Sequence, residues 1–216
     1  MQDLISAVKS GDAERVAALL DADPSRLGAG ENGTSAILLA MYYRHPEVAQ
    51  LFVDRGARLT IHEAAAVGDY AAVVSLLDAD PLLLDQCGGD GFQPLGLAIF
   101  FRHPEMARML IERGADVLAP AQNAMHVAPI HAAAAVSDRD SIELLLARGA
   151  DPNARQQSDY TPLHDVAARG DVELAKILIA GGADRGAKTS DGKTPADLAR
   201  DRGHVLFVEW IERVGE

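Results

Sequence analysis

The sequence predicts an all-α solenoid in which short helix-turn-helix units stack side by side. The main observation is a repeat: Gly149-Ala150-Asp151 recurs 33 residues later as Gly182-Ala183-Asp184, and Pro129-Ile130-His131 recurs at the same spacing as Pro162-Leu163-His164. The composition agrees, because 48% of the 216 residues are hydrophobic, mostly Ala, Leu and Val, whereas only 5% are aromatic. Such a chain suits small, closely packed helices better than one large aromatic core.

The clearest unit lies between Asp159 and Ala187. Pro162 is placed to begin a first helix, since proline is tolerated in the first turn, where its missing N–H has no partner in any case. Gly170-Asp171 forms the corner before a second helix, which ends at Gly181-Gly182. Both helices carry apolar residues at i, i+3 and i+4, which makes one face apolar. Helices this short cannot bury such faces alone, so each unit needs a copy on either side.

The same unit carries a family signature. It contains Thr161-Pro162-Leu163-His164, then Ala167, Gly170 and Gly182-Ala183-Asp184, and it resembles the ankyrin repeat in signature and period. The resemblance, which extends over nearly the whole chain, implies a single elongated ankyrin-repeat domain, residues 1–216. It also implies that the chain is not an enzyme and binds another protein through its concave face and the tips of its β-turn fingers. We assign no catalytic residue, no cofactor and no metal site.

We expect seven repeats in chain order, the first and last being caps with one solvated side. Their predicted ranges are 1–27, 31–57, 59–84, 90–116, 126–151, 159–184 and 191–214. Repeats one and two resemble three and four as a duplicated pair, since Arg44–Glu47 returns as Arg102–Glu105, 58 residues later. The last repeat carries Arg200, Asp201, Arg202 and Glu212 and is predicted to be the polar C-terminal cap, with Leu206, Phe207 and Trp210 facing inward.

The third repeat begins abruptly. Repeat two ends at Ala57 and repeat three begins at Leu59-Thr60, so Thr60 lies only three positions after Ala57, whereas other junctions spend roughly a dozen residues on a turn. We therefore expect the β-turn finger to be missing at this junction, which departs from the family pattern and removes one contact element.

Charge and cysteine content limit the classes of partner. The formal net charge is −12 with both signs spread along the chain, which argues against nucleic-acid or anionic-membrane binding, because these need clustered Lys and Arg. Cys87 is the only cysteine, so we expect no intramolecular disulfide and a cytoplasmic location. The first residues lack the apolar core of a signal peptide, and no stretch reaches the 18 apolar residues of a membrane span. We expect a monomer whose protein partner the sequence does not identify.

Three motifs invite a different reading of the chain. Gly28–Gly33 fits the spacing G-x-G-x-x-G of dinucleotide sites, and Ala187–Thr194 fits a relaxed phosphate-binding loop, but neither has the preceding strand and following long helix that such sites need. His131 and His164 occupy equivalent positions in adjacent repeats, roughly 8–10 Å apart. That distance is too large for one zinc ion, so we expect both to bond neighbouring backbone groups.

Aromatic pairs are the strongest indication of a binding site. Tyr42-Tyr43 and Phe100-Phe101 stand at the end of the first helix in repeats two and four, where the other repeats have small or polar residues. Adjacent helical residues point about 100° apart, so both members cannot enter the same core, and aromatic side chains anchor many interfaces. The alternative is that one member of each pair only fills space beside its small neighbours. The predicted contact residues are Tyr42, Tyr43, Phe92, Phe100, Phe101, Tyr160 and Arg169.

Two other functions remain open. A dedicated inhibitor or immunity-type partner of a single enzyme would use the acidity to mimic an anionic substrate, and its binding would depend steeply on salt. A small-ligand or enzymatic site in the finger loops would reveal itself by a ligand-induced rise in melting temperature, which we do not expect.

Overall fold

The computed structural model describes residues 2–213 and confirms the predicted all-α solenoid. The first helices of the successive repeats are α1 (Gln2–Ser10), α3 (Ala36–Tyr42), α5 (Ile61–Val67), α7 (Pro94–Phe100), α9 (Pro129–Ala135), α11 (Pro162–Ala167) and α13 (Pro195–Asp201). The second helices are α2 (Ala13–Ala22), α4 (Pro46–Asp54), α6 (Tyr70–Ala79), α8 (Pro104–Glu112), α10 (Arg139–Ala147), α12 (Val172–Ala180) and α14 (Val205–Arg213). Short connecting elements are the 3-10 helices η1 (Pro24–Gly28), η2 (Pro81–Asp85) and η3 (Gln157–Asp159) and the strands β1 (Gly30–Glu31) and β2 (Thr34–Ser35).

Local sequence explains where the helices begin. Four first helices, α7, α9, α11 and α13, start with proline at the first helical position. Several second helices instead follow an aspartate whose side chain accepts a hydrogen bond from a backbone N–H of the first turn, as Asp171 does from Leu174. Each such cap satisfies one of the donors that a helix start leaves without a partner.

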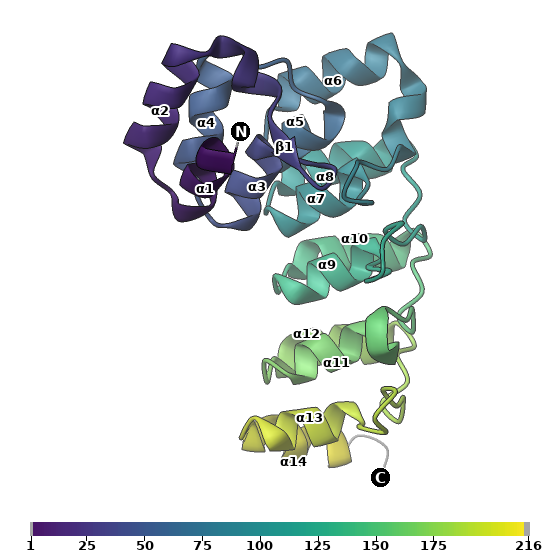
Figure 1. Cartoon of the computed structure of the whole chain (residues 1–216). Helices are drawn as coiled ribbons and strands as arrows, with labels where there is room; N and C mark the ends of the chain where they lie inside the picture. Colours follow the sequence, from purple (N-terminus) through teal and green to yellow (C-terminus); the bar gives the residue numbers. More distant parts are fainter. Residues whose placement is uncertain (1, 214–216) are drawn as a thin grey trace.

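The repeats stack through both helices and fingers. First helices of consecutive repeats contact one another from α1 to α13, and α8, α10, α12 and α14 form a second layer behind them (Figure 1). Backbone hydrogen bonds join neighbouring fingers, from Gln122 N–H to the Gly91 carbonyl and from Ser190 N–H to the Ser158 carbonyl. The stack is therefore continuous along both layers in its C-terminal part.

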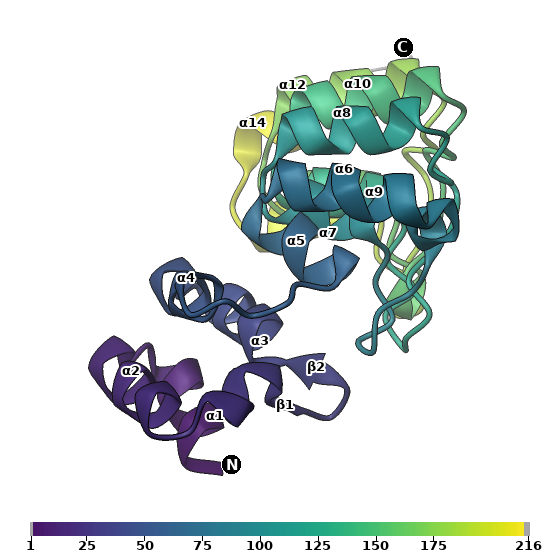
Figure 2. The same ribbon diagram turned by 90° about the horizontal axis from the view of Figure 1, so that it is seen from above.

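The junction between repeats two and three has no finger, as the sequence predicts. Helix α4 ends at Asp54 and α5 begins at Ile61, with only the turn and a short extended segment between them. Figure 2 looks along the stack of the later repeats, and α1–α4 lie to one side of it, so the solenoid changes direction here. The β1–β2 hairpin of repeat two consequently reaches the finger of repeat four, where a Cβ added at Gly89 would lie 2.1 Å from the Gly33 carbonyl oxygen.

Buried apolar side chains form two clusters rather than one. The first belongs to repeats one and two and includes Leu4, Val16 and Phe52. The second runs from Ile61 to Ile211, and Leu38 of α3 joins it across the junction. The division coincides with the junction that lacks a finger.

The C-terminal repeat corrects one prediction. Phe207 is buried and Trp210 packs partly against the core, as expected. Leu206 is 78% exposed, so the expectation that it faces inward is wrong. It lies beside Phe207 at the start of α14, where the rotation of about 100° per residue turns it away from α13. Val214, the end of the predicted seventh repeat, lies outside the described residues.

Candidate functional site

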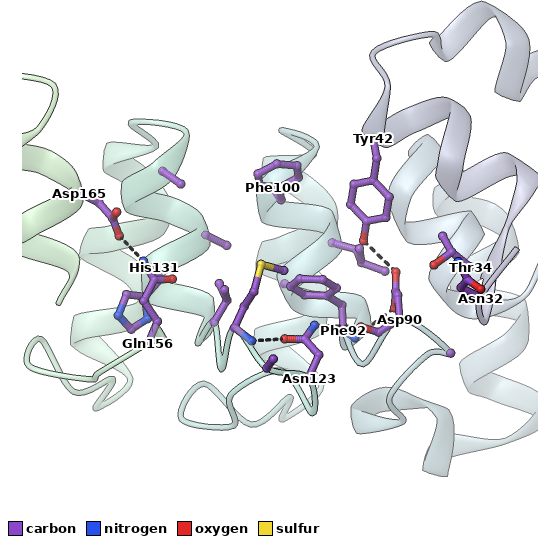
Figure 3. Close-up of a pocket in the computed structure, with 18 residues that line it drawn as sticks. Asn32, Thr34, Tyr42, Asp90, Phe92, Phe100, Asn123, His131, Gln156 and Asp165 are labelled. Atoms are coloured by element: carbon purple, nitrogen blue, oxygen red, sulfur yellow. Dashed lines mark hydrogen bonds between the residues drawn. The ribbon is translucent and has the colours of Figure 1, made fainter. Parts of the chain in front are cut away.

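A cavity of about 700 Å³ lies between the fingers and the first helices of repeats two, four, five and six. Its lining along α7 and α9 includes the small residues Gly96, Ala132 and Ala135. Aromatic side chains and the fingers form its walls (Figure 3). The volume falls within the range of about 300–1,000 Å³ typical of ligand sites, so a short segment of a partner has room to enter.

Four aromatic side chains from repeats two and four form one cluster at this cavity. The Tyr42 ring centre lies 6.4 Å from those of Phe92 and Phe100 and 5.4 Å from that of Phe101, and the Phe100 and Phe101 centres are 5.2 Å apart. They meet across repeat three because that repeat has no finger and because its α5 ends in small residues such as Ala66. Such aromatic pairs stabilise by about 0.5–1.5 kcal/mol beyond their buried area.

Tyr42 is held by a hydrogen bond as well as by stacking. Its hydroxyl donates to Asp90 Oδ2 at 2.8 Å, and the Phe92 N–H donates to Asp90 Oδ1 at 3.1 Å. Burial, assisted by the Asp90 carboxylate, raises the pKa of the Tyr42 hydroxyl, which therefore stays protonated as a donor. Both carboxylate oxygens of Asp90 thus accept hydrogen bonds from residues of the aromatic cluster.

The predicted contact residues divide into two groups. Tyr42, Phe92 and Phe100 line the cavity, and Phe100 is 43% exposed there. The cavity lining does not include the other four predicted residues, which are Tyr43, Phe101, Tyr160 and Arg169.

Those four residues have other neighbours. Tyr43 is 48% exposed, with the Lys9 ammonium 5.9 Å from its ring centre, so it faces repeat one. Phe101 is half-buried against the core. Tyr160 lies beside His164, with ring centres 5.5 Å apart, and Arg169 is exposed at the end of repeat six's first helix. In the Phe100-Phe101 pair, Phe101 is therefore the member that fills space beside its neighbours, as the alternative interpretation expects.

At the opposite end of the cavity from Asp90 lies a second carboxyl, Asp165 of α11 (Figure 3). The Gln156 side-chain amide donates to its Oδ2 at 3.1 Å. Burial raises the pKa of Asp165 to about 7, while Arg169 and Arg202 oppose that shift. Asp165 is not among the residues predicted from the sequence, although the sequence carries a signal for it: the equivalent residue of repeat five, 33 positions earlier, is Ala132.

Two buried histidines connect neighbouring repeats through contacts with backbone groups. His164 Nδ1 accepts a hydrogen bond from the Thr161 N–H at 3.1 Å, and its Nε2 lies 3.2 Å from the Lys193 carbonyl of the next finger. His131 makes the equivalent contacts to Ala128 and Tyr160. These bonds confirm the expected backbone role. Within residues 2–213, no three His, Cys, Asp or Glu side chains are grouped so that they could hold a metal ion.

A second set of histidines lies at the corners and was not predicted. His103 Nε2 lies 2.9 Å from the Ala66 carbonyl and His204 Nε2 lies 3.1 Å from the Ala168 carbonyl, each reaching back one repeat. The sequence contains a signal for this contact. Where the corner between the two helices of one repeat contains Gly-Asp, the corner of the next repeat contains His, as Gly68-Asp69 is followed by His103.

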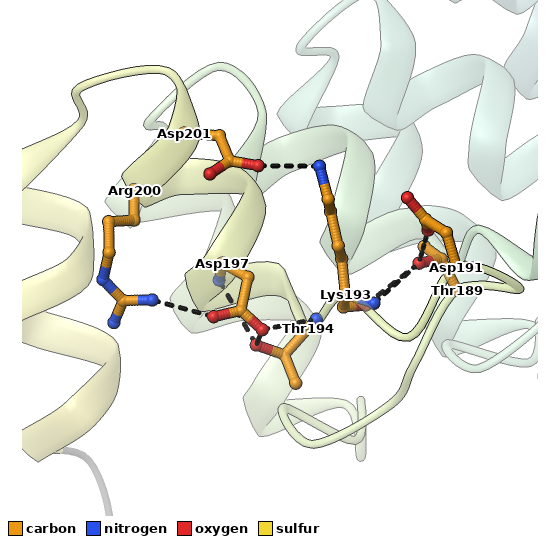
Figure 4. Close-up of polar contacts among 7 residues, drawn as sticks. All are labelled: Thr189, Asp191, Lys193, Thr194, Asp197, Arg200 and Asp201. Carbon is orange, nitrogen blue, oxygen red and sulfur yellow. Dashed lines mark hydrogen bonds and ion pairs between the residues drawn. The ribbon is translucent and has the colours of Figure 1, made fainter.

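The stretch that resembles a phosphate-binding loop is a finger followed by a helix cap (Figure 4). Thr189 and Lys193 close the finger with hydrogen bonds between side chain and backbone, and Lys193 Nζ bonds Asp201 at 2.8 Å. Thr194 and Asp197 then cap α13 reciprocally. The Lys193 ammonium is therefore paired with Asp201 at the surface of α13. Gly28–Gly33 likewise forms part of the β1–β2 hairpin and no strand-to-helix turn.

Two family models of ankyrin repeats match the sequence. One, for three copies, matches residues 61–156, and another, for many copies, matches residues 145–199. The chain belongs to the ankyrin repeat family. Ankyrin repeats are in general protein–protein interaction modules.

Two curated relatives agree with this assignment. The chain is 33% identical over 98 residues to the ankyrin repeat protein FPV240 of fowlpox virus, a match that covers 41% of this chain and 24% of the viral protein. It is 30% identical over 105 residues to the mouse ankyrin repeat and SAM domain-containing protein 6, covering 48% of this chain and 12% of the mouse protein. The matches thus span an eighth to a quarter of the relatives' length. No helix among residues 2–213 has the length and apolar character to span a membrane.

Proposed function

We propose that this ankyrin repeat chain is a non-enzymatic module that binds a partner protein in the groove between its fingers and first helices. The observation that carries the proposal is the aromatic wall of Tyr42, Phe92 and Phe100 beside a largely apolar cavity. Aromatic residues placed next to a pocket are the usual energetic anchors of protein interfaces.

The groove is preorganised for binding. The Tyr42–Asp90 hydrogen bond and the contacts among the aromatic rings hold its wall in place before a partner arrives. A rigid surface loses less conformational entropy on association, so more of the contact energy appears as affinity. We also propose Tyr43, Phe101, Tyr160 and Arg169 as contact residues outside the cavity, since Tyr43 and Arg169 are exposed and Phe101 and Tyr160 are partly exposed.

The proposal is tested by affinity capture from the native lysate with mass spectrometry. Ala135→Trp places an indole in the groove from the last residue of α9, which is half-exposed. Ala147→Trp makes the same change at the last residue of α10, which is exposed and outside the cavity. We expect a partner that the unaltered chain and Ala147→Trp retain and that Ala135→Trp loses. Equal retention by all three would move the binding site out of the groove.

The dedicated-inhibitor alternative differs from this proposal in its salt dependence. An interface anchored by Tyr42 and Phe100 should lose only a few-fold in affinity between low and physiological salt, because its contacts are mainly apolar. Binding driven by the net charge of −12 would weaken much more steeply.

A further inference from the structure

The ionisable side chains that can carry a charge in the groove near neutral pH are all acidic. Among the residues that line the cavity there is no lysine or arginine, whereas two aspartates, Asp90 and Asp165, are present. His131 adds no charge near neutral pH, because burial lowers its pKa to about 4 and both ring nitrogens lie against backbone groups. The side chains facing the cavity are thus apolar, neutral or acidic.

The two carboxyls differ in what they can still bind. Asp90 accepts a hydrogen bond at each oxygen, from the Tyr42 hydroxyl and from the Phe92 N–H. Asp165 accepts one from Gln156 at Oδ2, and no described residue donates to its Oδ1. Asp165 is therefore the carboxyl that remains open to a ligand.

Neighbouring arginines do not neutralise Asp165. Arg169 and Arg202 lie close enough to influence its titration, yet neither forms an ion pair with it within residues 2–213. Arg202 Nη1 donates instead to the Ala168 carbonyl at 3.3 Å, and Arg169 is exposed. Asp165 thus lacks a direct counterion at the end of an apolar cavity.

We propose that the groove accepts a partner segment in which a large apolar side chain lies close to a lysine or arginine. The apolar side chain enters the cavity beside Phe92 and Phe100, and the cation contacts the Asp165 carboxylate. This inference rests on the proposed function, since it states which chemistry the bound partner presents. A wholly apolar segment would desolvate Asp165 without compensating it, and an acidic segment would add repulsion.

The direct test is selection from a displayed library of random dodecapeptides on the unaltered chain. Parallel selections use Ala135→Trp, Asp165→Asn and the control Ala147→Trp. We expect enriched peptides to combine Phe, Trp, Leu or Met with a nearby Lys or Arg, to bind Ala147→Trp equally, and to lose about tenfold in affinity on Asp165→Asn. Asn is close to Asp in size and its carbonyl oxygen can still accept the Gln156 bond, so the variant should fold.

The pH dependence of an enriched peptide's affinity provides a second readout. For a carboxyl with a pKa of about 7, the ionised fraction rises about tenfold between pH 6 and pH 8. Of the groups near Asp165, Arg169 and Arg202 are the cations that oppose its pKa shift, while His131 stays neutral and Tyr42 stays protonated over this range. We therefore expect affinity to rise up to about tenfold between pH 6 and pH 8 for the unaltered chain and to stay level for Asp165→Asn.

The possible failures are distinguishable. Enriched peptides without a basic residue that still lose binding to Ala135→Trp would overturn the charge inference while leaving the groove as the binding site. Peptides that bind Ala135→Trp as well as the unaltered chain would contradict both proposals. If no peptide is enriched, the inference of a short linear segment is wrong, and the lysate capture still decides whether the groove binds a folded partner.

Discussion

At Asp165 the chain keeps an ionisable side chain where the preceding repeat has Ala132. Its carboxyl is half-buried, bonded to Gln156 and without a direct ion pair in the described part of the chain. Burying a charge in this way is unfavourable unless a partner compensates it. The ionised Asp165 carboxylate therefore destabilises the unbound protein, and a bound cation would compensate its charge.

That destabilisation predicts a pH-dependent gain in stability for Asp165→Asn. The folded pKa of about 7 lies above the ordinary value of 3.8, so between these values the folded state binds more protons than the unfolded state. The unfolding free energy of the unaltered chain should thus fall as pH rises from about 4 to about 7, relative to the variant. We expect the advantage of Asp165→Asn to grow by about 2–3 kcal/mol between pH 5 and pH 8, measured by urea unfolding. An advantage of the same size at both pH values would show that the ionised Asp165 does not destabilise the folded protein.

At the scale of the element, the helix-turn-helix corners at Gly11, Gly68 and Gly170 each lie against a histidine ring of the repeat that follows. Gly68 ends α5 with φ +83°, and the His103 ring from the next repeat lies where a side chain at Gly68 would be, 2.6 Å from an added Cβ. The same ring bonds the Ala66 carbonyl. The glycine is thus required both by the left-handed backbone and by the histidine that joins two repeats.

Two alanine substitutions separate these requirements. Gly68→Ala disturbs both the left-handed backbone and the histidine contact, whereas the control Gly56→Ala disturbs only the backbone. Gly56 has a similar φ of +80° but nothing within 4 Å of an added Cβ. We expect Gly56→Ala to lower the unfolding free energy by about 1–2 kcal/mol, the backbone term alone. Gly68→Ala should lower it by about 2–4 kcal/mol, because the His103 bond is disturbed as well. Equal losses in denaturant unfolding would mean that the histidine contact contributes nothing to stability.

At the scale of the whole molecule, the missing finger divides the solenoid. Repeats one and two have their own buried cluster, and the solenoid turns where α4 passes into α5 (Figures 1 and 2). The turn lets the fingers of repeats two and four meet at Gly33 and Gly89, and it creates the aromatic cluster across repeat three. In a repeat protein each repeat is stabilised chiefly by its neighbours, so a weak junction separates cooperative units.

We expect hydrogen exchange to divide the chain into two units, α1–α4 and α5–α14, because their buried residues form separate clusters apart from Leu38 of α3. Gly89→Ala should speed exchange in α1–α4 by at least about tenfold while leaving α9–α14 unchanged, since its Cβ would force the two fingers apart. Gly28→Ala is the control, as nothing lies within 4 Å of its added Cβ. Uniform protection along the chain, unaffected by Gly89→Ala, would show that the junction transmits stability as well as the others do.

The period, the Thr-Pro-Leu-His signature and the glycine exits determined the family and the all-α solenoid from sequence alone, because each depends on local conformation and on contacts with the adjacent copy. The same local reasoning predicted the backbone role of His131 and His164 and the absent finger before Ile61. It also placed Tyr42, Phe92 and Phe100 among the candidate contact residues.

Only the tertiary structure decided which aromatic side chains meet and what lies opposite them. Tyr42 reaches Phe101 across an entire repeat because the solenoid turns, and a change of direction depends on how two helix pairs dock, which no local pattern encodes. The same docking leaves Tyr43 beside Lys9 and encloses Asp165 at the end of the cavity. Burial and charge environment are sums over distant neighbours, so the groove and its one open carboxylate emerge only when all the repeats are in place.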